Sequence, residues 1–420
     1  MTQHLDSATM PEFFGKRFDS QALKLAASVI IFIFLIPYTA SLYNGLSRLF
    51  GMAFDIDYSV CVVVMAVLTA VYVIAGGYMA TAINDFIQGI IMLAGIVAVI
   101  LAVLSSQGGF LAALEKLAQV QGDSDIPGVY ASFFGPDPVN LLGVVILTSL
   151  GTWGLPQMVQ KFYAIKSETA ISKGTVISTL FALVVAGGCY FLGGFGRLFA
   201  DRMDVVDGVP AGGYDAVIPA MLSGLPAALI AVVVILVLSA SMSTLSSLVL
   251  ASSSTLTLDF IKGNIIKNMD EKRQVRWMRG LVVVFIAISV VLALIQYKSS
   301  VTFIAQLMGV SWGALAGAFL APFLYGLYWK RTTTAACWVS FLFSTAVMLA
   351  NIFVRSSFPA LLQSPINAGA FCMIAGLVIV PAVSLVTPAP DRRRLESVFA
   401  CYERRVTVTV KDSIGEQNQH

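Results

Sequence analysis

The stretch Ile230–Phe260, IAVVVILVLSASMSTLSSLVLASSSTLTLDF, combines enough apolar residues to cross a membrane with a dense run of hydroxyl side chains. No charged residue occurs between Asp215 and Asp259, a distance well beyond the ~20 apolar residues that a membrane-spanning helix needs. Helical positions three, four and seven apart share one face. The small and hydroxyl residues that share such a face are Ala240, Ser243, Thr244, Ser247, Ala251 and Ser254. The stretch therefore predicts a membrane helix with one narrow, oxygen-bearing face.

This face has two interpretations. Hydroxyl and carbonyl oxygens suit a hard monovalent cation that must bind and then leave, as in transporters that hold sodium near the bilayer midplane. Small residues also let membrane helices pack closely, and Ser and Thr hydroxyls can bond back to their own helix. Composition by itself favours the packing interpretation.

The composition of the whole chain is that of an all-α polytopic membrane protein. Of its 420 residues, 58% are hydrophobic and 12% are charged, whereas roughly a quarter of the residues in soluble proteins are charged. The only histidines are His4 and His420, so a histidine base or metal cage inside the membrane is excluded. The five cysteines form no disulfide or zinc pattern. We therefore expect no enzymatic activity, no cofactor and no nucleic-acid partner.

Ten nearly uncharged segments recur along the chain, and each predicts a membrane span. They lie near residues 22–47, 57–76, 82–105, 139–160, 174–196, 222–256, 280–297, 301–328, 334–354 and 365–387. The chain is accordingly divided into an N-terminal segment 1–21, a transmembrane transporter domain 22–387 and a tail 388–420.

The positions of the basic residues orient these spans. With ten crossings, five basic clusters fall on one side, and they begin at Lys16, Lys161, Lys262, Lys330 and Arg392. The other side receives few basic residues and two long loops, roughly 106–138 and 197–221, whose Gly, Pro and Asp content predicts irregular or short-helical structure. By the positive-inside rule, we expect a multi-pass protein of the plasma (inner) membrane with both termini cytoplasmic.

The tail carries an amphipathic pattern. Leu395, Val398, Phe399 and Tyr402 repeat at helical spacing among arginines. This pattern predicts a short helix that either lies on the cytoplasmic leaflet or is merely solvated.

The fourth span contains a predicted helix break. Gly151, Gly154 and Pro156 fall within six residues of LTSLGTWGLPQMVQ. Proline removes a backbone hydrogen bond, and glycine tolerates the backbone geometry that results. In membrane transporters such a break is accepted chiefly where the freed backbone lines a cavity. Trp153 and Gln157 flank it, and they offer an aromatic wall and an amide. A packing kink without a ligand is the alternative.

Two further regions carry polar groups that suit a bundle interior. In GGYMATAINDFIQGIIML, Gly76 and Gly77 predict a tight cytoplasmic turn, and Asp85 follows about one turn inside the next helix. Asp85 either serves the helix start or attracts a cation at the cytoplasmic mouth. Tyr38 in the first span and Trp312 in the eighth are candidate pocket residues, although a buried tryptophan usually serves packing.

Taken together, five motifs resemble the sodium/solute symporter family, most closely its sodium/proline branch. The motifs are PEFFGKRF before the first span, GGYMATAINDFIQ, GLPQMVQKF, SASMSTLSS and the segment from SWGALAGAF to YWKR. Each motif is weak alone. Five of them in family order, across roughly residues 10–390 and with matching hydropathy, make a specific signal.

The resemblance implies a leucine-transporter-like fold of two inverted five-helix repeats plus flanking helices, which works by alternating access with sodium driving solute uptake. It implies a sodium site at the Ala240 carbonyl and the Ser243 and Thr244 hydroxyls, with Asp85 near the inner sodium exit. The implied partners are sodium as the coupling ion, a small organic solute (an amino acid such as proline, or an organic acid or vitamin) and the lipid bilayer. The implied solute pocket contains Tyr38, Trp153, Leu155, Pro156, Gln157 and Trp312.

The chain departs from the family pattern in two places. Where the proline transporters carry Gly-Gln-Pro-His, this chain has Gly154, Leu155, Pro156 and Gln157, which argues against proline as the solute. The family also has three helices, one of them broken, before the PEFF-like segment, and this chain starts where those helices have ended. The sequence therefore predicts a partial inverted-repeat fold with half a sodium site.

Two functions follow from this pattern. The first is a sodium-coupled symporter represented by an amino-terminally shortened chain. The second is an inactive or structural membrane fragment, or one subunit of a split transporter. A membrane enzyme is a distant third, because the apolar segments contain no paired carboxylates, metal-ligand cluster or placed base.

Overall fold

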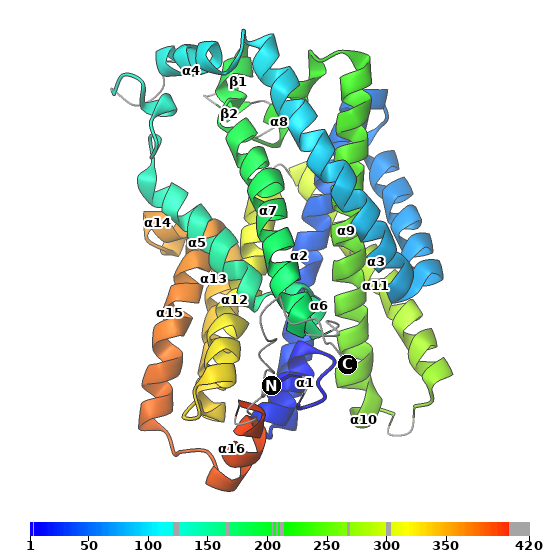
Figure 1. The fold of residues 1–420 in the computed structure, drawn as a ribbon, viewed down its shortest axis with the longest axis vertical. Helices are drawn as coiled ribbons and strands as arrows, with labels where there is room; N and C mark the ends of the chain where they lie inside the picture. Colours follow the sequence, from blue (N-terminus) through cyan, green and yellow to red (C-terminus); the bar gives the residue numbers. More distant parts are fainter. Residues whose placement is uncertain are drawn as a thin grey trace, which may run out of the picture.

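The chain folds into a bundle of long helices (Figure 1), because a helix satisfies every backbone hydrogen bond of an apolar segment within a membrane. The computed structural model describes residues 1–2, 4–120, 126–163, 168–203, 205–206, 209–210, 214–266, 269–299 and 304–402. Both ends of the described chain lie at the lower end of the bundle in Figure 1.

Within the described residues, nine helical segments are long and apolar enough to cross a membrane. They are α2 (Gln21–Phe54), two segments of α3 (Tyr58–Ser106), α7 (Glu168–Gly193), α9 (Ala227–Thr255), α11 (Glu271–Ser299), α12 (Ile304–Tyr328), α13 (Thr334–Phe353) and α15 (Pro365–Val386). The remaining predicted span is divided into α5 (Pro138–Gly154) and α6 (Pro156–Tyr163). Helices therefore coincide with all ten predicted segments.

Short elements fill the connections. They are α1 (Met10–Phe18), α4 (Phe110–Gln119), η1 (Val129–Ala131), η2 (Gly196–Arg202), β1 (Val205–Val206), β2 (Val209–Pro210), η3 (Tyr214–Ala216), α8 (Val217–Ser223), the π-helix η4 (Leu256–Ile261), α10 (Lys262–Asn264), η5 (Arg355–Ser357), α14 (Ala360–Gln363), α16 (Arg392–Phe399) and η6 (Ala400–Tyr402). The short helices predicted for the two long loops are present as α4 and η1 and as η2, η3 and α8. The second loop adds an antiparallel pair of two-residue strands.

The α3 helix bends sharply between its two membrane-crossing segments, Tyr58–Gly76 and Ile83–Ser106. The Asn84 amide donates to the Tyr72 hydroxyl at 2.9 Å. In a straight helix these residues would lie about 18 Å apart along the axis. Figure 1 shows the two legs meeting at the right-hand side of the bundle, above α10. The predicted tight turn at Gly76 and Gly77 is not a separate turn, because α3 is assigned as one helix through these positions.

The central helix of the bundle is α12, which packs against α15, α13, α2 and α5. In its most apolar window, 83% of the residues are buried. A methyl group at Gly313 would lie 2.6 Å from the Cα atom of Gly369, and one at Gly317 would lie 2.8 Å from Cβ of Cys372. Small residues thus bring the α12 and α15 backbones into direct contact, as is usual between membrane helices.

The N-terminal helix α1 is anchored on this central packing. Phe14 contacts the rings of Phe319 and Phe341 at centroid distances of 5.7 and 5.2 Å. The buried Arg17 side chain donates from Nε to the Gly326 carbonyl at 2.9 Å. The segment PEFFGKRF therefore packs as part of the bundle at its lower end in Figure 1.

The tail helix α16 packs on α1. Val398 and Phe399 are buried, and the Arg17 guanidinium lies 5.0 Å from the centre of the Phe399 ring. The His4 ring contacts the Ser397 carbonyl at 3.0 Å. The predicted amphipathic helix is present, and Val398 and Phe399 of its apolar face pack on protein, whereas Tyr402 remains exposed.

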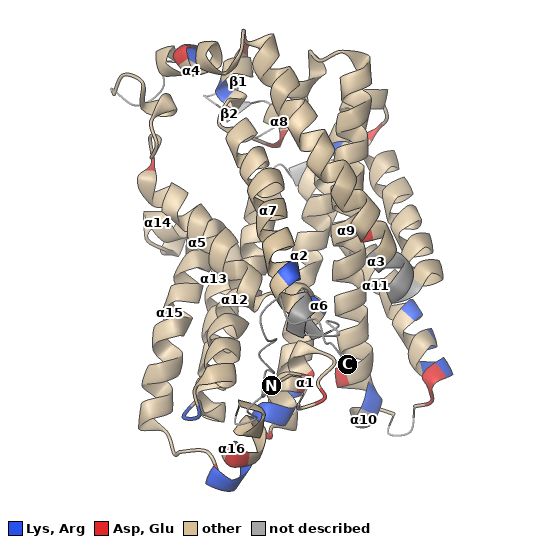
Figure 2. Cartoon of the chain, in the orientation of Figure 1, with Lys and Arg blue, Asp and Glu red and all other residues tan. Residues whose placement is uncertain are grey.

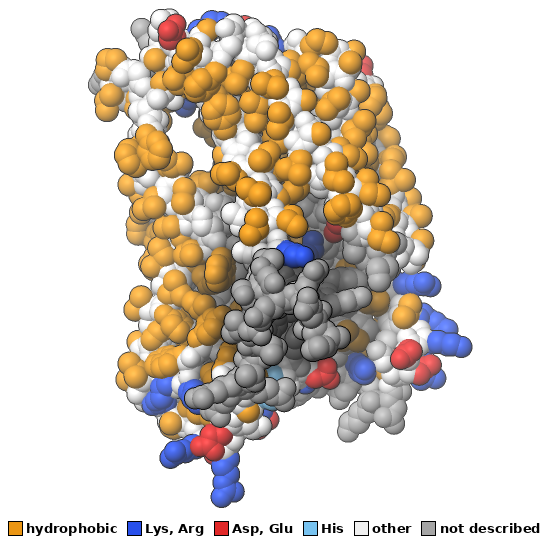
Figure 3. All heavy atoms as spheres, viewed as in Figure 1, with side chains coloured by type: hydrophobic (Ala, Val, Ile, Leu, Met, Phe, Trp, Pro, Cys, Tyr) orange, Lys and Arg blue, Asp and Glu red, His pale blue; other side chains and the backbone are white. Residues whose placement is uncertain are grey.

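The outer surface of the bundle matches a membrane environment. Hydrophobic side chains cover the face shown in Figure 3, and α7 is buried over only 6% of its most apolar window. Lysine and arginine gather mainly at the lower end of the view in Figure 2. The chain is a multi-pass membrane protein.

Candidate functional site

The helix break predicted in the fourth span is present. The α5 helix ends at Gly154, Leu155 is extended with φ −83° and ψ 123°, and α6 begins at Pro156. The Leu155 carbonyl accepts hydrogen bonds from the N–H groups of Met158 and Val159, each at 3.1 Å. Because Pro156 has no N–H to donate, the helical hydrogen bonds of α5 end here and those of α6 begin.

Two glycines seat this break on α12. A methyl group at Gly151 would lie 2.9 Å from Cε3 of Trp312, and one at Gly154 would lie 2.8 Å from Cα of Ala316. Backbone contact at Gly154 leaves no room for a side chain. The break is thus held against the central helix of the bundle.

The Gln157 side chain is buried just after the break. It is 3% exposed, and neither Oε1 nor Nε2 has a hydrogen-bond partner among the described residues. A buried amide without partners carries a desolvation penalty of about 1–3 kcal/mol. Such a group is chemically suited to bind a polar part of a solute.

An aromatic pair lies beside Gly151 of α5. The Tyr38 and Trp312 rings meet edge to face at 86°, with centroids 5.7 Å apart. Both side chains are buried, and the Trp312 Nε1–H has no hydrogen-bond acceptor within the part of the chain that is described. Tyr38, Trp312 and Gly151 therefore bring α2, α12 and α5 together.

Trp153 lies apart from this aromatic pair. Its side chain is 63% exposed, and it lines a separate cavity of about 300 Å³ with Leu320, Tyr328 and Met1 among others. Leu155, in contrast, is completely buried. The structure thus separates Trp153 from the other predicted pocket residues.

The oxygen-bearing face of α9 is present as a regular helix. The Thr244 hydroxyl donates to the Ala240 carbonyl at 3.0 Å. The Ser243 carbonyl accepts from the hydroxyls of Ser246 at 2.9 Å and Ser247 at 3.0 Å. These bonds are the back-bonding expected from packing. They leave lone pairs on the Thr244 hydroxyl that can also accept a cation, whereas the Ala240 carbonyl already accepts both the hydroxyl and the helical N–H of Thr244.

The α9 helix lies against α2, α3 and α11, with a smaller contact to α6. Ser243 and Thr244 are half-buried. Thr69 of α3 approaches this region, and its hydroxyl lies 3.8 Å from the Met242 sulfur. The face that carries Ser243 and Thr244 is therefore within the bundle, not on its fully exposed surface.

Asp85 lies in the second leg of α3 and faces the broken helix. Its Oδ2 atom is 3.6 Å from Nζ of Lys161 in α6. The Asp85 side chain is 22% exposed and that of Lys161 is 51% exposed. This ion pair connects α3 to α6, and Asp85 lies within α3 and not at its start.

A polar pocket at the opposite end of the bundle was not predicted. Its volume is about 390 Å³, and its walls include Ser47, Arg48, Asp55, Asp57 and Tyr58. The Tyr58 ring stacks on Tyr297 with centroids 3.8 Å apart. The first five lie at positions 47–58, where α2 ends and α3 begins, whereas Tyr297 is distant in sequence, and no sequence spacing shows that it completes the pocket.

Asp215, in η3 near the same end, ties a connecting loop to a membrane helix. Its carboxylate accepts from the N–H of Ile304, at the start of α12, at 3.2 and 3.0 Å. Burial raises the pKa of Asp215, while the Ile304 N–H and the nearby Arg48 oppose that rise.

A broken membrane helix with a buried amide, in a bundle with a hydroxyl-bearing helix, is typical of secondary transporters. The profile of the family described as "Sodium:solute symporter family" matches residues 2–343. The chain belongs to this family. It is a sodium-coupled solute symporter polypeptide and not an enzyme, as the sequence motifs predicted.

Relatives of known function support this assignment. The chain is 27% identical to the osmoregulated proline transporter OpuE of Bacillus subtilis, over 92% of this chain and 76% of that protein. It is 29% identical to the sodium/proline symporter of Haemophilus influenzae, over 82% of this chain and 68% of that protein. For the sodium/proline symporter of Staphylococcus aureus the identity is 28%, over 79% and 63%.

The fold also matches a solved structure. A Na⁺-coupled sialic acid symporter, in a substrate-bound outward-open state, superimposes with a TM-score of 0.70 at 18% sequence identity. The match covers 93% of this chain and 80% of that chain. The expected leucine-transporter-like architecture is therefore confirmed.

Proposed function

We propose that this chain takes part in sodium-coupled uptake of a small zwitterionic solute, an amino acid in the first instance, by alternating access across the plasma membrane. The observation that carries the proposal is the helix break at Leu155, with a buried unpartnered amide at Gln157 beside it. Half-helix ends and freed backbone groups are what solute sites in this transporter class are built from. An organic acid or vitamin is the second solute class.

The proposed solute pocket is formed by Tyr38, Leu155, Pro156, Gln157 and Trp312. It combines aromatic and apolar walls with one amide and no charged side chain, which suits a small solute that carries both charges itself. The change from Gly-Gln-Pro-His to Gly-Leu-Pro-Gln argues for a solute other than proline, even though the named relatives transport proline. Trp153 would contribute to solute binding only from the far side of the helix break.

The proposed sodium ligands are the Ala240 carbonyl and the hydroxyls of Ser243 and Thr244. The donor set fits the ion, because sodium prefers oxygen ligands and leaves more readily from neutral oxygens than from carboxylates. The three residues lie within two turns of one helix, so they can contact one ion. They supply one side of a site, and the facing ligands must come from another element.

We propose that Asp85 lies at the inner exit for sodium. A carboxylate this close to the inner end of the spans attracts a cation that leaves the bundle. At 3.6 Å from Lys161, the pair is long and partly exposed, so an arriving sodium ion can compete for the carboxylate.

The proposed orientation places both termini in the cytoplasm, with residues 22–387 as the transporter domain. The basic residues at the inner end support this orientation through the positive-inside rule (Figure 2).

The test is uptake by the purified chain in proteoliposomes. Labelled amino acids, including proline, are offered with and without an inward sodium gradient. We expect sodium-dependent uptake of at least one zwitterion, and we expect Ser243→Ala together with Thr244→Ala to raise the half-saturating sodium concentration by about tenfold.

The matched control is Thr175→Ala. Thr175 lies on exposed α7, and its hydroxyl bonds back to the Ile171 carbonyl at 2.9 Å, much as Thr244 bonds to Ala240. This change should leave sodium activation unaltered. Sodium activation that is equal in all three proteins would refute the proposed sodium ligands.

A further inference from the structure

Asp259 is a buried carboxylate at the inner end of the proposed sodium helix. It is 1% exposed and lies in η4, the π-helical continuation of α9. A charged group in a membrane span is costly unless it is paired, and π-helical turns occur frequently at functional positions. The proposed sodium and solute sites do not use this group.

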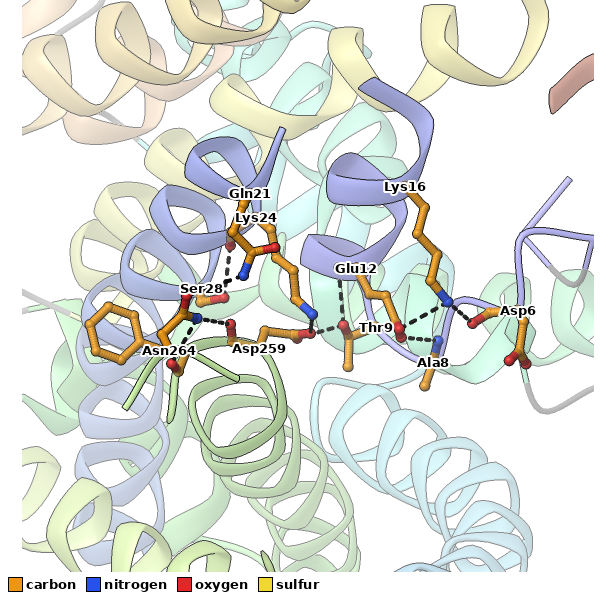
Figure 4. A network of polar contacts seen from close by, with 11 residues as sticks. Asp6, Ala8, Thr9, Glu12, Lys16, Gln21, Lys24, Ser28, Asp259 and Asn264 are labelled. Atoms are coloured by element: carbon orange, nitrogen blue, oxygen red, sulfur yellow. Dashed lines mark hydrogen bonds and ion pairs between the residues drawn. The ribbon is translucent and has the colours of Figure 1, made fainter. Parts of the chain in front are cut away.

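Two side chains from other helices reach the Asp259 carboxylate (Figure 4). Nζ of Lys24, in the first turn of α2, lies 3.1 Å from Oδ1. The hydroxyl of Thr9, the N-cap residue of α1, donates to Oδ2 at 2.5 Å. We call Thr9, Lys24 and Asp259 the inner clamp. It joins α1, α2 and the end of α9 at one carboxylate.

A second set of bonds reinforces the same junction. The Asn264 amide donates to the carbonyls of Asp259 at 3.3 Å and Phe260 at 3.0 Å. The Gln21 amide donates to Oδ1 of Asn264 at 3.3 Å. The backbone of η4 is thus also tied to the start of α2, as Figure 4 shows.

The Thr9 side of the inner clamp is anchored to the central packing. Thr9 caps α1 by accepting from the Glu12 N–H at 3.2 Å, and α1 is anchored on α12 and α13 through Phe14 and Arg17. The inner clamp therefore connects α9 to the central packing of the bundle.

We propose that the inner clamp fixes the orientation of α9 and that Asp259 is a positioning residue for sodium binding at Ser243 and Thr244. This inference rests on the proposed function. From residue 244 to residue 259 the helix rises about 22 Å, so a small pivot at Asp259 moves the hydroxyl face relative to its neighbours. A sodium site needs its oxygens placed within a few tenths of an ångström.

The substitution Asp259→Asn tests this role. It keeps the shape and one oxygen acceptor for Thr9, but it leaves the Lys24 charge without its partner. We expect the half-saturating sodium concentration to rise by about tenfold, within the range usual for coupling between separate sites. Lys24→Gln should act in the same direction. The double substitution Lys24→Asp with Asp259→Lys restores opposite charges, and it should recover most of the sodium affinity.

The measurement is the thermal midpoint of the purified chain as a function of sodium, at constant ionic strength with N-methylglucamine. A merely structural role for Asp259 would lower the midpoint at every sodium concentration and leave the half-saturating concentration unchanged. The control Lys16→Gln removes an ion pair with Glu12 on α1 but leaves the inner clamp intact. It should change neither quantity.

Amide hydrogen exchange in sodium-free protein gives a second readout. Asp259→Asn should speed exchange along α9 as far as Ser243, whereas Lys16→Gln should not. If Thr244→Ala fails to shift the half-saturating sodium concentration, the proposed sodium site is wrong, and exchange alone then decides whether Asp259 positions α9. If Thr244→Ala shifts it while Asp259→Asn changes neither sodium affinity nor exchange, the inner clamp inference is overturned.

Discussion

Two helix contacts in this bundle depend on different interactions. One is the contact between α12 and α15, and the other is the contact of the end of α9 with α1 and α2. Glycines bring the first pair so close that a methyl group at Gly313 would meet the Gly369 backbone at 2.6 Å. The second contact depends on one carboxylate, Asp259, bonded to Lys24 and Thr9. Close backbone packing has no alternative arrangement, whereas an ion pair can open and close. The end of α9 is thus joined to α1 and α2 by polar bonds, while the rest of α9 packs on α2, α3 and α11.

The largest effect is expected from disrupting the contact between α12 and α15. Gly313→Leu forces a side chain into the Gly369 backbone and the Met348 side chain, so it should destabilise the bundle by about 3 kcal/mol or more. Gly280→Leu is the control, because nothing lies within 4 Å of the Cβ position there. The yield of monodisperse protein in detergent measures both. Equal yields would mean that α12 and α15 can separate without cost.

The next effect separates stability from function at the helix break. Gln157→Leu replaces a buried amide that has no partner among the described residues, so it should raise the thermal midpoint, since the penalty removed is about 1–3 kcal/mol. It should also raise the half-saturating solute concentration by about tenfold, because the solute loses its amide contact. Thermal unfolding and uptake measure the two quantities. A stabilised variant with unchanged uptake would show that Gln157 does not face the solute.

The control for that change is Gln274→Leu. The Gln274 amide donates to the Met269 carbonyl at 2.8 Å near the inner end of α11. Removing this satisfied amide should lower the thermal midpoint slightly and leave solute affinity unchanged.

A smaller effect is expected at the link between α3 and α6. Lys161→Gln removes the partner of Asp85, and the partly exposed pair contributes less than about 1 kcal/mol to stability. The freed carboxylate should attract sodium more strongly from the inner side. Sodium-driven efflux from proteoliposomes should then reach half-saturation at a concentration about two- to threefold lower. A rise in that concentration would contradict the exit role of Asp85.

The smallest effect concerns the pH dependence of α1. Although partial burial of Glu12 opposes its ionisation, the Ala8 N–H and the nearby Lys16 and Lys24 lower the pKa of Glu12. A lowered pKa in the folded state means that the ionised carboxylate stabilises α1 above the ordinary pKa of glutamate, and that this stabilisation is lost as the pH falls through the lowered pKa. Acidification should therefore lower the thermal midpoint of Glu12→Gln slightly less than that of the unmodified protein. An unchanged or larger fall would contradict this assignment.

Much of the fold could be predicted from the sequence, because its signals are local. The uncharged segments correspond to helices, and the break at Leu155 follows from Gly154 and Pro156, since proline removes a backbone donor whatever its surroundings are. The tail helix was also predicted. Its docking on Arg17 and His4 was not, because amphipathic spacing shows that a face must be covered and not what covers it.

The site residues could be predicted only in part. The spacing of Ser243 and Thr244 placed them on one face of α9, and they remain predicted sodium ligands. The isolation of Trp153 was not foreseen, because proximity in sequence to Gln157 does not fix the direction of a side chain across a helix break. The bonds of Asp259 to Lys24 and Thr9 join residues more than 200 positions apart, and no sequence period reports such contacts.

The most direct test of the central claim is equilibrium binding of radioactive sodium to the purified chain, compared with Thr244→Ala and with the control Thr175→Ala. We expect saturable binding to the unmodified chain and to Thr175→Ala, with affinity reduced by about tenfold or more in Thr244→Ala. Binding of equal affinity in all three proteins would contradict a sodium site on the hydroxyl face of α9.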